Sequence, residues 1–323
     1  MKRRTTLLGA LAAPLMLAAG GASLAQAVYP SRTIRLVSPS PPGGAGDVSN
    51  RILAKHLSDQ MGQPVVIDYR LGGNGVVAAQ EALRGDREGY TIFLGTLTAL
   101  VGNLYLMKSI PYDPSTDFAP VSLIGTIPFI LVANMDLPVK SVKELIAYAK
   151  ANKGKVTFAS ANTTSQVSAS MFASMTGIEL QHIPYKSAPA SLNDVVSGQV
   201  AISFVDIPSA RGLIQSGRLR LLGVTADKRI NLFPDTPSIA ESVPGYEMIG
   251  WTAMTVPAGV DPAIVRRLSV ETGKVLSKPE VREQMANVGI VAASSTPEEL
   301  ASYLRTERPR WSRRVHDAGI QPE

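Results

Sequence analysis

Loops rich in glycine, proline and hydroxyl groups are the parts of this 323-residue chain whose residue types could do chemistry. Their residues are Pro42, Gly43, Gly44 and Asp47 in the run PPGGAGD, Thr96 and Thr98 after the run TIFLG, and Ser160, Asn162, Thr163, Thr164 and Ser165 in the run SANTTS. Glycine lets a ligand approach the backbone closely, and amides at helix N-termini favour anions. The loops therefore predict a site in which neutral donors hold an anion, although helix capping alone also explains Asp47 and Ser165.

Motifs for metal binding and for catalysis are missing from the sequence. His56, His182 and His316 lie far apart with no second ligand at metal-binding spacing, and the chain contains no cysteine. The patterns G-x-S-x-G, S-x-x-K and G-x-x-x-x-G-K-[ST] do not occur. We therefore predict no metal, no cofactor and no enzyme activity. A catalytic triad dispersed along the chain is the alternative that stays open.

One glycine-rich run matches the short form of a dinucleotide-binding fingerprint. Residues 73–78 read G-x-G-x-x-A after the run PVVIDY. A dinucleotide site needs this fingerprint on the first strand-to-helix turn, and an acidic residue about 20 residues further on at the end of the next strand. The next run, TIFLG, ends in Gly95 and is followed by Thr96 instead. The mismatch favours a chain without a nucleotide cofactor.

Strands that alternate with helices should position the three loops. Residues 34–38, 64–69 and 91–95 are short apolar runs, each followed by a loop and a helix-like segment, the first of them at 47–61. This alternation predicts a mostly parallel α/β sheet. In such a sheet the ligand lies outside the carboxyl ends of the strands, and the loops follow those ends.

The same alternation recurs in the middle of the chain and predicts a second lobe. Strands at 156–159, 180–184 and 200–205 alternate with helices at 165–175 and 190–197. The helices predicted after residue 260 have no sheet of their own. We expect them to pack onto the first lobe, which makes that lobe discontinuous.

These elements predict where the lobes begin and end. Lobe 1 is predicted to comprise residues 28–127 and 249–323, and lobe 2 residues 128–248. The segments 128–133 and 248–256 then pass between the lobes, and we interpret them as hinge strands. The pattern fits ordinary core strands equally well.

The first 27 residues have the pattern of a secretory signal peptide. A basic start, a short apolar stretch at 7–19 and an A-x-A end predict cleavage after about Ala27 and a periplasmic protein, exported by either the Sec or the Tat route. An uncleaved anchor is the alternative, but Pro14 interrupts a stretch shorter than the about 20 residues of a membrane span. Removal of Lys2, Arg3 and Arg4 lowers the formal charge from +6 to +3, too little to indicate nucleic-acid binding.

Over nearly its whole mature length the sequence resembles the Bug family, the substrate-binding components of tripartite tricarboxylate transporters. The resemblance depends on the order and spacing of several runs together, which are YPSRTIRLVSPSPPGGAGD, YRLGGNGVVAAQEA, REGYTIFLGT, IPYDPSTDFAPVSLIG, HIPYKSAPASLNDVVSGQV, GRLRLLGVTADKR, FPDTPSIAE, PGYE with Trp251, and VPAG. It implies a two-lobed α/β periplasmic binding protein, a type II-like Venus flytrap with two hinge strands. It also implies that the chain binds a ligand without transforming it.

The resemblance also implies which residues contact the ligand. Carried over by motif position, the contacts are the residues of the three loops above together with Asp206 at the end of the run AISFV. Asp206 would accept from a protonated ligand group or a water molecule, and a helix cap before Pro208 is the alternative. Ser40 stands where the family commonly has an aromatic residue, and the 161–164 loop is poorer in glycine than is usual. Both departures leave dicarboxylates, tricarboxylates, acidic amino acids and aromatic acids open as ligands.

We therefore predict an exported, monomeric receptor that captures a small carboxylate for the membrane subunits of a tripartite transporter, without nucleic acid as a partner. A ligand-presenting partner of a membrane sensor kinase is the first alternative. An α/β hydrolase is the second.

Overall fold

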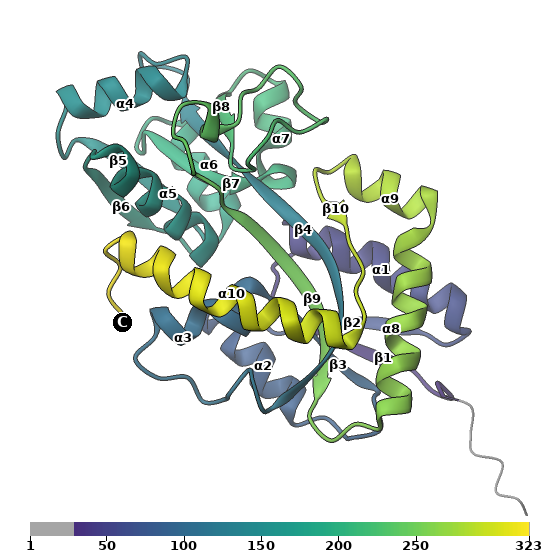
Figure 1. Ribbon diagram of the computed structural model, residues 1–323. Helices are drawn as coiled ribbons and strands as arrows, with labels where there is room; N and C mark the ends of the chain where they lie inside the picture. The colour runs from purple at the N-terminus through teal and green to yellow at the C-terminus, as the bar shows by residue number, and fades with distance from the viewer. Residues whose placement is uncertain (1–28, 323) are drawn as a thin grey trace, which may run out of the picture.

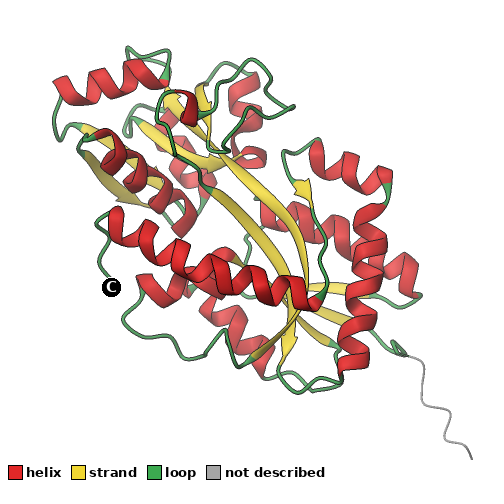
Figure 2. Cartoon of the chain, in the orientation of Figure 1, coloured by secondary structure: helices red, strands yellow, loops and turns green. Residues whose placement is uncertain are grey.

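The computed structural model describes residues 29–322, so the predicted signal peptide lies outside the described residues. Ten strands form one continuous sheet in the order β2-β1-β3-β9-β4-β7-β5-β6, and β8 and β10 also pair with β4. Helices lie on both sides of the strands (Figure 2). The predicted α/β class is confirmed.

The first part of the chain forms a parallel three-stranded unit with β1 in its centre. Ile34 of β1 pairs with Val65 of β2, and Arg35 pairs with Thr91 of β3. Helix α1 ends at Gly62, whose left-handed conformation lets its amide donate to the Ser58 carbonyl. The elements are β1 (Ile34–Ser38), α1 (Ala45–Met61), β2 (Val65–Tyr69), a 3-10 turn (Gly73–Gly75), α2 (Val76–Leu83), β3 (Thr91–Thr96), a π turn (Thr98–Gly102) and α3 (Asn103–Leu106).

The middle of the chain forms a second unit in which β7, β5 and β6 run parallel and β8 pairs antiparallel with β4. Strands β5 and β7 are mostly buried, as expected where helices cover both faces, whereas the edge strand β6 is partly exposed. The elements are α4 (Val142–Ala151), β5 (Val156–Ser160), α5 (Thr163–Thr176), β6 (Leu180–Pro184), α6 (Ala188–Val196), β7 (Ile202–Asp206), α7 (Ile207–Gln215), β8 (Leu219–Val224) and a 3-10 turn (Ile239–Glu241).

Two long strands connect these units. β4 (Phe118–Asn134) pairs with β9 (Ile249–Pro257) as far as Pro128, and from Phe129 onward it pairs with β7 and β8. In Figure 1 both strands run diagonally from one unit to the other. The segments predicted as hinge strands belong to β4 and β9. The change of partner at Phe129 supports a lobe boundary near residues 127 and 128, and we keep the predicted division as a proposal.

Thr225 joins the two connecting strands where they part. Its hydroxyl accepts from the Phe129 amide at 2.8 Å and donates to the Met248 carbonyl at 2.6 Å. Its own amide donates to the Phe129 carbonyl at 2.9 Å, and the side chain is fully buried. One residue therefore fixes how β4 and the start of β9 diverge.

The C-terminal helices pack onto the sheet from outside. α8 (Pro262–Ser277) and α9 (Pro279–Ala286) lie against α1, and β10 (Val291–Ala292) adds a short pairing to β4. α10 (Pro297–Asp317) begins beside β4 and extends to α5, where the Ser174 hydroxyl donates to the Asp317 carbonyl at 2.6 Å (Figure 1). The last helix therefore contacts both units. Within residues 29–322, no helix has the length and apolar character needed to cross a membrane.

Candidate functional site

A cavity of about 880 Å³ lies between the two units, beyond the carboxyl ends of the parallel strands. Strand ends and the loops after them supply most of its wall. The lining residues are 39–46, 71–75, 96, 98, 127, 129, 161, 162, 185–189, 206, 208, 209 and 250–252. Both units therefore contribute to one site, as expected for open α/β sheets.

Four helices begin at this cavity. The N-cap residues are Gly44 of α1, Asn162 of α5, Ser187 of α6 and Asp206 of α7, and all four line the cavity. The side chains of the last three accept from amides of their own helices. The partial positive charges of four helix N-termini thus converge on one space, which favours an anion there.

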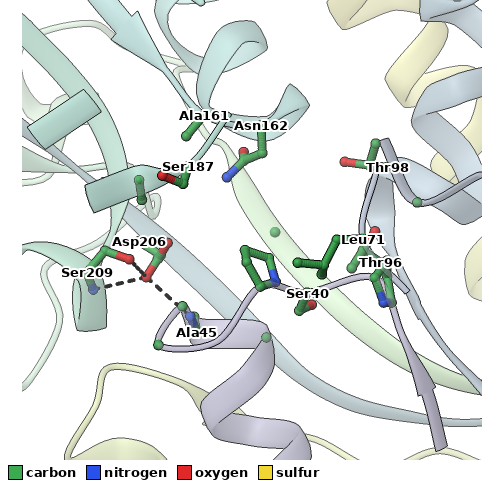
Figure 3. A pocket seen from close by; sticks show the side chains of 18 of the residues that line it. Ser40, Ala45, Leu71, Thr96, Thr98, Ala161, Asn162, Ser187, Asp206 and Ser209 are labelled. Atoms are coloured by element: carbon green, nitrogen blue, oxygen red, sulfur yellow. Dashed lines mark hydrogen bonds between the residues drawn. The ribbon is translucent and has the colours of Figure 1, made fainter. Parts of the chain in front are cut away.

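Helix α1 is capped differently, because Gly44 has no side chain. Its first amide, on Ala45, donates to Oδ1 of Asp206 at 3.2 Å, across the cavity from the other unit. The same Asp206 oxygen accepts from the Ser209 amide at 3.2 Å and the Ser209 hydroxyl at 2.9 Å (Figure 3). One carboxylate therefore caps two helices and links the two halves of the site.

The charges that line the cavity are few. Among the described residues, Asp206 is the only acidic lining residue and Lys186 the only basic one. Burial raises the pKa of Asp206, although its hydrogen bonds from Ser209 and Ala45 oppose that rise. Within residues 29–322, no group of three or more histidine, cysteine, aspartate or glutamate side chains is placed to hold a metal ion. The cavity is suited to binding an anion through neutral groups.

The structure brings seven of the predicted site residues into the cavity wall and leaves five outside it. The residues in the wall are Pro42, Gly43, Gly44, Thr96, Thr98, Asn162 and Asp206, several of them labelled in Figure 3. The residues behind the wall are Asp47, Ser160, Thr163, Thr164 and Ser165.

Asp47 supports the first loop from behind. Its carboxylate accepts from the Gly43 amide at 2.9 Å, from Tyr69 Oη at 2.5 Å and from Arg51 Nε at 2.9 Å. Burial alone would raise the pKa of Asp47, but these hydrogen bonds outweigh it and hold the pKa below its usual value. Asp47 therefore fixes the shape of the glycine loop.

The residues of the 160–165 loop that lie outside the wall make hydrogen bonds away from the cavity or are buried. Ser160 Oγ lies 2.6 Å from His182 Nε2. Ser165 donates from its hydroxyl to the Phe204 carbonyl, and its amide donates to Asn162 Oδ1 at 2.9 Å. Thr163 and Thr164 are buried in the first turn of α5. Only Asn162 of the predicted set in this loop reaches the cavity.

Two wall segments were missed by the sequence reasoning. The first, residues 71–75, is the run that resembles a dinucleotide fingerprint, and here Gly72, Gly73, Asn74 and Gly75 all adopt positive φ. Asn103 holds this turn by donating from Nδ2 to the Asn74 carbonyl at 3.1 Å. The second, residues 185–189, follows β6. Both follow the carboxyl ends of strands that the sequence did predict, so the rule that identified the other loops also applied to them.

The fold and the cavity define a solute-binding protein of the periplasmic type, and comparison with known proteins gives the family. Residues 49–320 match the tripartite tricarboxylate transporter family receptors. The chain is 35% identical over 297 residues to Protein BugT of Bordetella pertussis, which covers 91% of each sequence. The chain therefore belongs to this family, also called the Bug family, whose members are solute-binding receptors and not enzymes. The resemblance predicted from the sequence is confirmed.

Two solved structures of similar proteins contain carboxylates. R. palustris Rpa4515 with adipate has a TM-score of 0.88 and 32% identity, and the match covers 91% of this chain and 100% of that one. MatC from Rhodopseudomonas palustris with bound malate has a TM-score of 0.80 and 26% identity, covering 89% of this chain and 100% of that one. These neighbours confirm the fold expected of a periplasmic binding protein.

Proposed function

We propose that this chain is an exported receptor that captures a small carboxylate in the periplasm and delivers it to the membrane subunits of a tripartite transporter. The observation that carries the proposal is the convergence of four helix N-termini on one cavity, to whose wall residues 29–322 contribute no arginine. Membership of the family and the adipate and malate held by two neighbours support it.

Neutral donors are sufficient for useful affinity. A hydrogen bond to a charged group contributes about 1.5 to 3 kcal/mol, so three to five such bonds supply the roughly −8 kcal/mol of a micromolar ligand. In our proposal Gly43, Gly44, Thr96 and Thr98 bind from the first unit and Asn162 from the second. Asp206 accepts from a protonated group of the ligand or from water.

The residues behind the wall keep a role in this proposal as supports. Asp47 holds the glycine loop through the Gly43 amide, and the Ser165 hydroxyl ties the first turn of α5 to the Phe204 carbonyl. Substitution of these two side chains is expected to weaken binding through loop geometry. The signal peptide at 1–27, its cleavage after about Ala27 and a monomeric mature protein complete the proposal.

Closure of the two units is the expected response to the ligand. A ligand shifts the protein toward the closed form only if it binds that form more tightly, as it does when both units contact it. At about a hundred times the dissociation constant, binding adds about 2.7 kcal/mol of apparent stability.

A thermal-shift screen of mono-, di- and tricarboxylates and acidic amino acids tests the ligand class. The expected hit is a carboxylate that raises the melting temperature and reduces the radius of gyration in small-angle scattering. Native mass spectrometry of protein purified without denaturation would show a ligand retained from the cell. Stabilisation by a nicotinamide dinucleotide with no response to any carboxylate would contradict the proposal. For the delivery step, uptake of the hit should require both this chain and the membrane subunits.

A further inference from the structure

Helix α7 of the second unit meets two helix ends of the first unit. Its N-cap residue Asp206 accepts from the Ala45 amide at the N-terminus of α1 at 3.2 Å. Further along the same helix, the Arg211 guanidinium donates to the Asn287 carbonyl at the C-terminus of α9. Each charge has the sign that its helix end favours, a carboxylate at the positive end of α1 and a guanidinium at the negative end of α9.

The end of α9 is built to accept this contact. The Ile290 amide donates to the Met285 carbonyl at 3.0 Å, as in a Schellman motif, and Gly289 occupies the left-handed position with φ of 78°. The Asn287 carbonyl is one of those that a helix C-terminus leaves without a partner. Among residues 29–322 its only donor is Arg211, so the second unit completes the cap of a helix in the first unit.

Gly289 also lets α7 approach the backbone of the first unit closely. A Cβ on Gly289 would lie 2.5 Å from Ile207 Cδ1 and 3.1 Å from Ile207 Cβ, whereas carbon atoms pack best at about 3.5 to 4.0 Å. Rotation of the Ile207 side chain moves its Cδ1 but leaves its Cβ in place. Any larger residue at position 289 would therefore push α7 away from α9.

The two units are joined more firmly at α10 than at α7. At α10, one cluster of buried side chains includes Phe93 of the first unit, Phe172 of the second and Trp311 of α10 itself. At α7, Ile207 belongs to the core of the second unit and Met285 to that of the first, and no cluster of buried apolar residues among the described ones contains both. In Figure 1, α7 and α9 lie on one side of the two connecting strands and the end of α10 lies on the other. Separation at α7 exposes less apolar surface, so the units should open there.

We propose that Ile207, Arg211 and Gly289 form a latch that holds this receptor closed and sets its affinity for every ligand by the same factor. The three residues lie outside the cavity wall and are positioning residues, because they act through the approach of α7 to α1 and α9. The latch rests on the proposed function, which supplies an open and a closed form. When a binding-competent form is less populated, every ligand that requires it binds more weakly in the same proportion. Selectivity between ligands is then left to the cavity wall.

The chain offers a matched control for each latch variant. Gly177 ends α5 in the same motif as Gly289, with φ of 65° and the Ile178 amide donating to the Ala173 carbonyl at 3.1 Å, but a Cβ there would meet nothing within 4 Å. Gly177→Ala therefore introduces the same backbone strain as Gly289→Ala without touching the other unit. Arg218→Met is the control for Arg211→Met.

Arg218 follows α7, is exposed, and makes no side-chain hydrogen bond or ion pair with another described residue. Its replacement therefore removes the same charge from the same region and leaves the latch intact.

The test measures affinities by calorimetry for adipate and malate, or for the two strongest hits of the carboxylate screen, together with the melting temperature without ligand. Gly289→Ala should weaken both ligands by one common factor of roughly five to a hundred, because closure then forces an overlap with Ile207. Arg211→Met should weaken both by about twofold to tenfold, the loss of one hydrogen bond. Gly289→Ala and Gly177→Ala should lower the ligand-free melting temperature alike, since each places alanine at positive φ, and only the first should lose affinity.

Each remaining outcome overturns a different statement. If Gly289→Ala binds both carboxylates as tightly as Gly177→Ala does, the latch is wrong and the proposed function stands. If either latch variant weakens one carboxylate about tenfold more than the other, the residue acts through the cavity wall and the latch is again wrong. If Arg211→Met lowers the ligand-free melting temperature and leaves both affinities unchanged, its contact is structural only. If wild type binds no carboxylate of the panel, the proposed function fails and the latch fails with it.

Discussion

Replacing Thr225 by valine should destabilise the protein through the junction of its two connecting strands. Valine has the shape of threonine but neither accepts nor donates a hydrogen bond. The Phe129 amide would lose its acceptor at 2.8 Å, and the Met248 carbonyl would lose its donor at 2.6 Å. Both groups lie at a position where Thr225 itself is fully buried, so water does not easily replace the lost bonds.

The expected magnitude follows from the number of groups left unsatisfied. Each buried polar group without a partner costs about 1 to 3 kcal/mol, so the two together predict a loss of about 2 to 6 kcal/mol. At roughly 2 to 4 °C per kcal/mol, even the lower half of this range lowers the melting temperature by about 4 to 16 °C. The fall is measured by calorimetry, and the free energy of unfolding by urea denaturation.

Thr225→Ser is the control, because it keeps the hydroxyl and removes only a methyl group. Its expected cost is about 1 kcal/mol from lost apolar burial. A valine variant no less stable than the serine variant would refute the reasoning, since the hydroxyl would then contribute nothing to the junction.

Three further predictions concern the cavity and its supports. Asp206→Asn keeps the acceptor and removes the charge. Burial raises the pKa of Asp206 in the folded state, so the stability that this carboxyl contributes is present below its unfolded pKa and is lost as pH rises through its folded pKa. The variant should therefore be more stable than wild type at pH 7 and lose this advantage in acid. A gain in stability that is equal at all pH values would contradict this. Gly75→Ala should lower the free energy of unfolding by about 1 to 3 kcal/mol in a urea titration, because φ is 90° and the new Cβ would lie 3.0 Å from Ala99 Cβ. Gly212→Ala on α7 is the control: its new Cβ would have nothing within 4 Å, so the same titration should show no loss or a gain in stability. Tyr69→Phe removes the 2.5 Å hydrogen bond to Asp47 and should weaken carboxylate binding severalfold, because Asp47 holds the glycine loop. Calorimetry gives the affinity, and an affinity equal to that of wild type would show that the loop keeps its shape without this bond.

Local sequence determined the strands and the loops that follow them. The strand predicted at 180–184 has the observed bounds, and α8 lies after residue 260, where helices were predicted. Short apolar runs and glycine or proline turns are read from near neighbours, so these elements did not require knowledge of the fold. Some local signals were present and unused: Ser141 and Glu144 have the spacing of a helix start, and α4 begins there.

The family was also readable from the sequence, because the order of several motifs is specific even where each is weak. The departure at Ser40 was visible too. Its neighbours were not, since Gly46 and Thr252 come from a helix and from a strand about 200 residues away.

Only the tertiary structure decided which loops share the cavity and which side chains face it. That outcome depends on the strand order, in which β9 inserts between β3 and β4, and on the change of partner within β4. Asp206 caps α1 across 161 residues of sequence, and α10 contacts both units. Such contacts are set by packing and strand pairing over long separations, so no local pattern in the chain records them.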